Sequence, residues 1–393
     1  MKGQISNTLK ENFRQYGMAF VLVLIIMLFQ MLTKGRLLMP LNVTNLILQN
    51  GYVLILAIGM LPVIITGRID LAVGSVVAFI GAIAAIMIVT MKIGFVPTLL
   101  TCLIISALIG SWNGFWIAVV NVPAFITTLA SMLIFRGLTI AFLNGRSIGP
   151  FTDEFRAISS KFVPDFLGNL FHIGKKQNLT ALVAGLLLCA FFVVKEIRSR
   201  KSTKKYGFST LPLSFGLIKL VIICVAIMAF FYTLGAYEGI PYLLLLLFVL
   251  VMLYSFIMNR TVIGRRIYAL GSNETAARLS GINTTKLVFL TNINIGVLAA
   301  IAGIVFAARL NAGTPKAGSG FELDAIAACF IGGASVYGGT GVISGAILGT
   351  LIMGVMNNGM SILGISADYQ QAIKGIVILF AVASDILAKN RQK

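Results

Sequence analysis

The sequence predicts an all-α polytopic membrane protein with about 10–12 transmembrane segments and with both termini in the cytoplasm. Apolar residues make up 58% of the 393 residues and charged residues 11%, with a mean hydropathy of +0.98. A soluble domain has about 45–50% apolar and about 25% charged residues, so this composition excludes a water-soluble globule. The apolar residues also gather in runs of about 20, which is the length that crosses a bilayer as a helix.

Twelve apolar segments follow one another along the chain. They lie near 18–33, 45–66, 71–91, 95–120, 124–143, 178–195, 214–234, 240–258, 286–308, 322–336, 341–364 and 369–388. The segments 18–33 and 322–336 are short, and the second is rich in glycine at its end, so a re-entrant or half-length segment is expected there. The first segment is followed by Lys34-Gly35-Arg36 rather than by small residues, which indicates a retained helix and not a cleaved signal.

The basic residues orient the chain. The net charge is +19, and 17 of the 31 Lys and Arg residues lie in four clusters, with 3, 6, 5 and 3 cations: Lys2 to Arg14, Lys195 to Lys205, Arg260 to Lys286, and Lys389 to Lys393. Six, two and four apolar segments separate successive clusters, and these even numbers allow all four to lie on one side. The positive-inside rule makes that side the cytoplasm, and the interspersed apolar runs exclude a nucleic-acid-binding face. The long loop 144–177 then lies outside.

Several kinds of chemistry are missing from the sequence. There is no GxxxxGK[ST] phosphate loop and no HExxH, and the single histidine, His172, lies in a loop. A proton-coupled carrier keeps acids deep in its helices, whereas all twelve acids here lie in loops or near segment ends. The chain is therefore expected to be a channel or the non-enzymatic pore subunit of a machine driven by another chain. A sodium-coupled carrier, which can use backbone carbonyls, stays as an alternative.

The cytoplasmic segment 259–286 has the composition of an ordered element. Glu274 to Leu279 favour a short helix, Ser272 or Asn273 can cap its start, and Gly281 can terminate it. The segment is predicted to be a coupling loop that receives a partner protein. Its candidate contact residues are Glu274, Ala276, Ala277, Arg278 and Gly281.

Four stretches of the sequence resemble the permease subunits of bacterial ABC importers for monosaccharides, the ribose, xylose, arabinose and galactose group. The resemblance covers nearly the whole chain in the right order, with Ala72 and Ala130 departing from the usual residues. The charged cytoplasmic insert 195–213 and the loop 144–177 make it more similar to the longer xylose-type or multiple-monosaccharide branch. The matching stretches are Gly67–Ser75, Phe125–Leu138, Gly264–Asn283 and Gly318–Gly341.

This resemblance implies a single transmembrane permease domain over residues 1–393, in the inner membrane of a bacterium. The implied partners are a second copy of the chain, a cytoplasmic ABC ATPase that uses ATP and Mg, a periplasmic sugar-binding protein and the lipid membrane. No cofactor is expected on this chain and no nucleic acid. The alternatives are a permease of the same superfamily for branched-chain amino acids, a sodium-coupled transporter, and a membrane-embedded enzyme acting on lipid-linked sugars.

Polar and aromatic residues in or beside the apolar segments are the candidates for gating or for the substrate path. Hydroxyl groups of a sugar need amide, carboxylate or aromatic partners. For each candidate a structural role competes: Asp70 can cap a helix, amides can join helices, and Gly341, Gly345 and Gly349 can allow close helix packing. The path candidates are Asp70, Phe125, Thr127, Thr128, Asn292, Asn294, Glu322 and Asp324.

Overall fold

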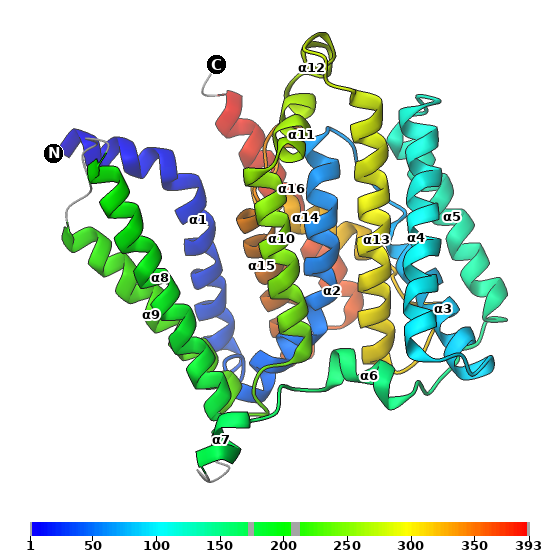
Figure 1. Ribbon diagram of the computed structural model, residues 1–393, viewed down its shortest axis with the longest axis horizontal. Helices are drawn as coiled ribbons and strands as arrows, with labels where there is room; N and C mark the ends of the chain where they lie inside the picture. The colour runs from blue at the N-terminus through cyan, green and yellow to red at the C-terminus, as the bar shows by residue number, and fades with distance from the viewer. Residues whose placement is uncertain (1, 172–176, 206–212, 391–393) are drawn as a thin grey trace. The chain divides into compact units, whose positions relative to one another are not determined.

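The structure, a computed structural model, describes residues 2–171, 177–205 and 213–390. Every regular element in these ranges is a helix, apart from the isolated bridges Ile148–Gly313 and Phe162–Pro241 (Figure 1). Each of the twelve predicted apolar segments coincides with a helix, so the all-α prediction is confirmed. His172 lies outside the described residues.

Nine helices in the described ranges are long and apolar enough to cross a membrane. This finding confirms a polytopic membrane protein. The nine are α2 (Pro40–Ile65), α3 (Val73–Ala85) continued by the π-helical turn η1 (Ile86–Thr90), α4 (Phe95–Ala118), α5 (Ala124–Phe142), α8 (Leu179–Lys205), α9 (Leu213–Gly235), α10 (Tyr242–Arg260), α13 (Thr284–Leu310) and α15 (Ile343–Ile362).

The other helices are shorter or carry more charge. The α1 helix (Lys2–Leu32) has a short apolar part at Gly17–Leu32, and α16 (Ala367–Asn390) ends the described chain. The α14 helix (Phe321–Ile331) has only 11 residues, so the predicted segment 322–336 is indeed half-length. Four short helices complete the fold: α6 (Asp153–Ser160), α7 (Phe166–Phe171), α11 (Val262–Ser272) and α12 (Glu274–Leu279).

The chain forms two compact units. The smaller unit comprises residues 38–45 and 161–242, and the larger comprises the rest, so α2 begins in one and continues in the other. In the smaller unit α8 and α9 form a hairpin. Residues 195–205 of the predicted charged insert continue α8 as helix, whereas 206–212 lie outside the described residues. The single permease domain expected from the sequence remains a prediction.

Glycines bring the central helices of the larger unit into backbone contact. A Cβ on Gly110 of α4 would lie 2.5 Å from the carbonyl oxygen of Asn292 on α13, and one on Gly296 would lie 2.5 Å from that of Ser106. The prediction for Gly345 and Gly349 is also confirmed: a Cβ there would lie 2.0 and 1.9 Å from carbonyl oxygens around α14. Small residues let helix backbones approach closely where lipid supplies no hydrophobic drive.

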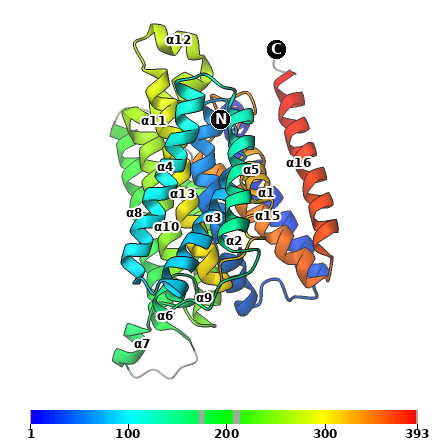
Figure 2. The ribbon, with the colours of Figure 1, turned by 90° about the vertical axis from the view of Figure 1, so that its right-hand side faces the viewer.

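The helices of the larger unit place different segments of the chain at its two ends. The start of α1, the end of α16 and α12 lie at one end, and α6 lies at the other (Figures 1 and 2). This arrangement agrees with the even numbers of segments that separate the three basic clusters of the larger unit, near the N-terminus, at 260–286 and at the C-terminus. The assignment of that end to the cytoplasm remains a prediction from charge.

Candidate functional site

Three segments far apart in the sequence meet at the α12 end of the larger unit. They are residues 65–68 after α2, the helices α11 and α12, and the turn 333–341 between α14 and α15; together we call them the junction. The Gly339 N–H donates to the Ile65 carbonyl at 2.8 Å, and the Tyr268 hydroxyl donates to the Gly341 carbonyl at 2.7 Å. Three of the stretches singled out in the sequence therefore form one structural site.

Gly271 of α11 sits at the centre of the junction. A Cβ at this position would lie 1.7 Å from the Ile65 carbonyl oxygen and 2.8 Å from the Gly339 nitrogen. The neighbouring residue, Leu270, is buried with Leu287 and Val288 of α13. The helix α11 thus packs against the backbone at Ile65 and Gly339 and against apolar side chains of α13. Its start is capped by Thr261, whose hydroxyl accepts from the Gly264 N–H at 3.3 Å.

The short helix α12 has the ends that the sequence predicts. The side chain of Asn273 accepts from the Ala276 N–H at 2.9 Å, and Glu274 lies in the first turn. Gly281 has a φ of +79° just after the helix, a backbone conformation that glycine adopts without strain. The other candidate cap, Ser272, belongs to α11 and donates to the Tyr268 carbonyl instead.

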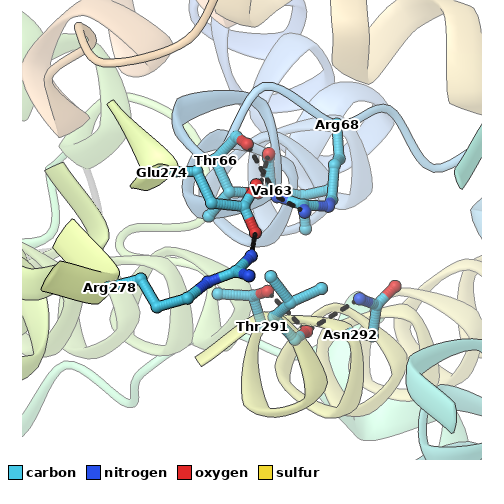
Figure 3. A network of polar contacts seen from close by, with 8 residues as sticks. Val63, Thr66, Arg68, Glu274, Arg278, Thr291 and Asn292 are labelled. Atoms are coloured by element: carbon cyan, nitrogen blue, oxygen red, sulfur yellow. Dashed lines mark hydrogen bonds and ion pairs between the residues drawn. The ribbon is translucent and has the colours of Figure 1, made fainter. Parts of the chain in front are cut away.

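One ion pair fastens α12 to the segment after α2. Nη2 of Arg68 lies 3.1 Å from Oε2 of Glu274, and Arg278 lies 3.9 Å from the other oxygen of that carboxylate (Figure 3). Arg68 also donates to the Thr66 carbonyl at 2.9 Å. Partly exposed pairs of this kind contribute about 1 kcal/mol or less to stability. The pair therefore links α12 directly to the segment 66–68 while adding little free energy.

The outer side of the junction has two large apolar side chains that are largely exposed. Leu279 is 85% exposed and Tyr337, on the turn, is 74% exposed, while Ala276 is exposed and Ala277 is buried. Arg278 is also exposed and lies 3.9 Å from Glu274. Of the residues predicted to contact a partner, Ala276 and Arg278 are therefore on the surface and Ala277 is not.

Asp70 and Thr128 lie where α3 and α5 begin. Asp70 is buried, and its Oδ1 accepts from the N–H of Ala72, the residue before α3, at 2.7 Å. The N-cap position of α3 is Ala72, so Asp70 holds the turn that precedes the helix rather than capping it as the sequence suggests. Burial raises the pKa of the Asp70 carboxyl to about 6; the backbone N–H groups of Ala72 and Val73 oppose this shift and the Glu322 carboxylate adds to it. Thr128 donates to the Ala124 carbonyl at 2.8 Å, with the Ile69 carbonyl 3.5 Å away.

The remaining path candidates do not gather at one place. Thr127 is buried, whereas Phe125 is 59% exposed on α5. The Asn292 amide donates to the Val288 carbonyl of its own helix at 2.8 Å, and Asn294 accepts from the Tyr254 hydroxyl of α10. The amide of Asn294 thus joins two helices. A substrate role for these residues stays a prediction.

Glu322 lies in the first turn of the half-length helix α14, against the start of α3. A Cβ on Gly74 would clash with the backbone carbonyl oxygen of Gly318 as well as with the Glu322 carboxylate, so the loop before α14 requires glycine at 74. Arg136 of α5 holds the preceding loop by donating to the carbonyls of Ala317 (2.6 Å) and Pro315 (3.2 Å). The structure also pairs Asp324 with Lys374 of α16, a contact that sequence reasoning missed.

A bundle of helices that are long and apolar enough to cross a membrane defines the chain as a polytopic membrane protein. The chain belongs to the family described as branched-chain amino acid transport system / permease component, whose model matches residues 42–382. It is a multi-pass membrane protein and a transport subunit rather than an enzyme.

The chain aligns with its relatives along nearly their whole lengths. It is 38% identical to the xylose transport system permease protein XylH of Escherichia coli (strain K12), over 99% of this chain and 96% of that protein. The XylH of Haemophilus influenzae is 37% identical over 97% of this chain and 98% of its own. The ribose import permease protein RbsC of Escherichia coli (strain K12) is 34% identical over 88% and 85%. No solved structure matches the chain.

Proposed function

We propose that this chain is the membrane-spanning subunit of an ATP-driven importer in the bacterial inner membrane that carries a monosaccharide, xylose first among the candidates. The observation that carries the proposal is the full-length similarity to permeases named for xylose and ribose transport. The junction supports it from the physical side, because it joins an exposed docking surface to the helices of the bundle.

In this mechanism two copies of the chain enclose the path, and a periplasmic binding protein delivers the sugar. A cytoplasmic ABC ATPase, which uses ATP and Mg, binds α12 through Ala276, Leu279 and Arg278. The chain itself binds no cofactor. Movement of α12 passes through the Arg68–Glu274 pair to α3 and through Gly339 and Gly341 to α14. Work is transmitted because the ATPase binds the two pore states with different affinity.

The alternatives predict different substrates or different energy sources. A branched-chain amino acid permease shares the family model, yet the relatives reported above are named for sugars. A sodium-coupled carrier would work without an ATPase.

The deciding experiment is uptake of labelled xylose by proteoliposomes that contain the permease, the ATPase and the binding protein. We expect uptake that requires ATP and all three components and that excess leucine does not reduce. Ribose serves as the competing sugar that ranks the substrate preference. Uptake by the permease alone under a sodium gradient would contradict the proposal.

The proposed orientation has its own test. Ser272→Cys places a thiol at the exposed end of α11, and Thr152→Cys places one at the opposite end, before α6. In intact spheroplasts a membrane-impermeant maleimide should label Cys at 152 and leave Cys at 272 unlabelled until the membrane is opened. Labelling at 272 from outside would reverse the orientation derived from the basic clusters.

A further inference from the structure

The helices α14 and α16 are joined by an ion pair among apolar side chains. Nζ of Lys374 lies 2.9 and 3.3 Å from the two carboxylate oxygens of Asp324, with the side chains 19% and 11% exposed. We propose that Lys374 is a positioning residue of the transport cycle: through Asp324 it makes α16 follow α14 when the junction moves. This inference rests on the proposed function. It extends the proposed route of movement, from α12 to α14, as far as α16.

Stability alone gives little reason for such a pair. Lys374 stands between Ile373 and Gly375 on a helix that follows with Ile376 and Val377. Removing two charges from water costs free energy that their attraction hardly recovers, and apolar residues of similar size often hold helices as well or better. Ionisable groups among membrane helices are, for the same reason, candidates for function. What the pair offers is a fixed, directional link.

The helix α16 has few other polar anchors in the part that the structure describes. Gln370, one turn before Lys374, donates to the Ile365 carbonyl at 2.8 Å and to the Ser361 hydroxyl at 3.2 Å, both near the end of α15. Ile373 and Val377 pack against a buried cluster that includes Met356 and Met360. These contacts tie α16 to α15 and α1. Among the described side chains, Lys374 supplies the one ion pair that ties it to α14.

The other end of α14 reaches the junction. The helix ends at Ile331, and the following turn binds Ile65 through Gly339 and Tyr268 through Gly341. The close approach of Gly349 to Ala328 locks α14 to α15 along its length. A displacement of α11 therefore reaches α14 through backbone contacts, and the ion pair carries it on to α16.

The exposed side of α16 is apolar, with Tyr369, Ile376, Leu379 and Phe380 exposed, whereas Asp324 is buried against Lys374. Because the ion pair makes α16 follow α14, a movement of α14 carries this apolar side along and changes the surface that the two helices present together. Alternating access requires coordinated movement of helices of this kind.

The test compares two double variants with the single ones. Lys374→Met and Asp324→Asn each leave one unpaired charge, and both should lower stability and uptake. Lys374→Met/Asp324→Leu should restore the melting temperature and still reduce sugar transported per ATP hydrolysed by about tenfold, in the range reported for residues along a coupling route. The exchange Lys374→Asp/Asp324→Lys should recover most of that ratio. Gly375→Ala, with nothing near its Cβ, is the matched control on α16.

The outcomes separate the two proposals. If the apolar double variant transports with the wild-type ratio, the pair is only structural and the inference is wrong. If it melts at the wild-type temperature but stays uncoupled, the inference holds even where the exchanged pair does not fold. A wild-type permease without any ATP-dependent sugar uptake would instead remove the proposed function, whatever the variants do.

Discussion

Ala276→Glu and Leu279→Asp should each abolish ATP-driven uptake while the permease folds and inserts normally. Both side chains are exposed on α12, so the substitutions change the free energy of unfolding by no more than about 0.5 kcal/mol. If α12 is the docking surface we propose, each substitution places a charge in the contact with the ATPase, which costs about 2 kcal/mol or more of binding. Co-purification of the ATPase and sugar-stimulated ATP hydrolysis measure the effect.

A control on the same helix sharpens this result. Thr275→Ala changes an exposed neighbour without adding charge and should keep both readouts. Gly281→Leu should also lose ATPase binding and uptake, but for a different reason. The space around this position is open, yet a side chain at a φ of +79° strains the backbone at the end of α12. Full activity of the Ala276 and Leu279 variants would mean that the ATPase engages another cytoplasmic turn.

Gly271→Ala should produce the largest loss of stability among single-methyl substitutions at the junction. Its Cβ would lie 1.7 Å from the Ile65 carbonyl oxygen and 2.8 Å from the Gly339 nitrogen. Both are backbone atoms, so neither can move away by a change of side-chain rotamer. Overpacking of this kind costs about 3 kcal/mol, which exceeds the gain of about 1 kcal/mol from replacing glycine in a helix. We expect a lower melting temperature, poor yield and loss of uptake together, as measured in detergent and in proteoliposomes.

Gly137→Ala is the matched comparison for this variant. Gly137 also lies within a helix, α5, but nothing lies within 4 Å of its Cβ, so the substitution should be neutral or slightly stabilising. Equal behaviour of the two variants would show that α11 does not pack as described. Both variants replace glycine by alanine within a helix, so the gain in helix propensity is the same. The difference in their melting temperatures therefore measures the effect of the close backbone contact at Gly271.

Much of the fold follows from local sequence. Hydropathy located all twelve apolar segments, and the short α14 was expected from the length and glycine content of its stretch. The helix α12 and its caps at Asn273 and Gly281 were predictable because capping depends on neighbouring residues alone. The helix α11 was not predicted. Its signal in the sequence is Thr261, whose hydroxyl accepts from the Gly264 N–H three residues later and so caps the start of the helix.

The candidate site was predictable only in part. The residues predicted for coupling come from one continuous stretch; of these, Ala276 and Arg278 are exposed on α12, whereas Ala277 is buried. The path residues were chosen one at a time for their chemistry, and the structure gives several of them structural contacts: Asp70 holds the turn before α3, and Asn294 joins α13 to α10.

By itself, the sequence determined the class of protein, the number and order of apolar helices and the ends of α12, since hydropathy and capping act over a few residues. Only the tertiary structure decided which distant residues meet. Arg68 and Glu274 are 206 positions apart, and Asp324 and Lys374 are 50 apart. Such pairs depend on how helices pack, and packing is set by the close approach of glycines such as Gly271 and Gly349, each of which works only against a partner from another part of the chain.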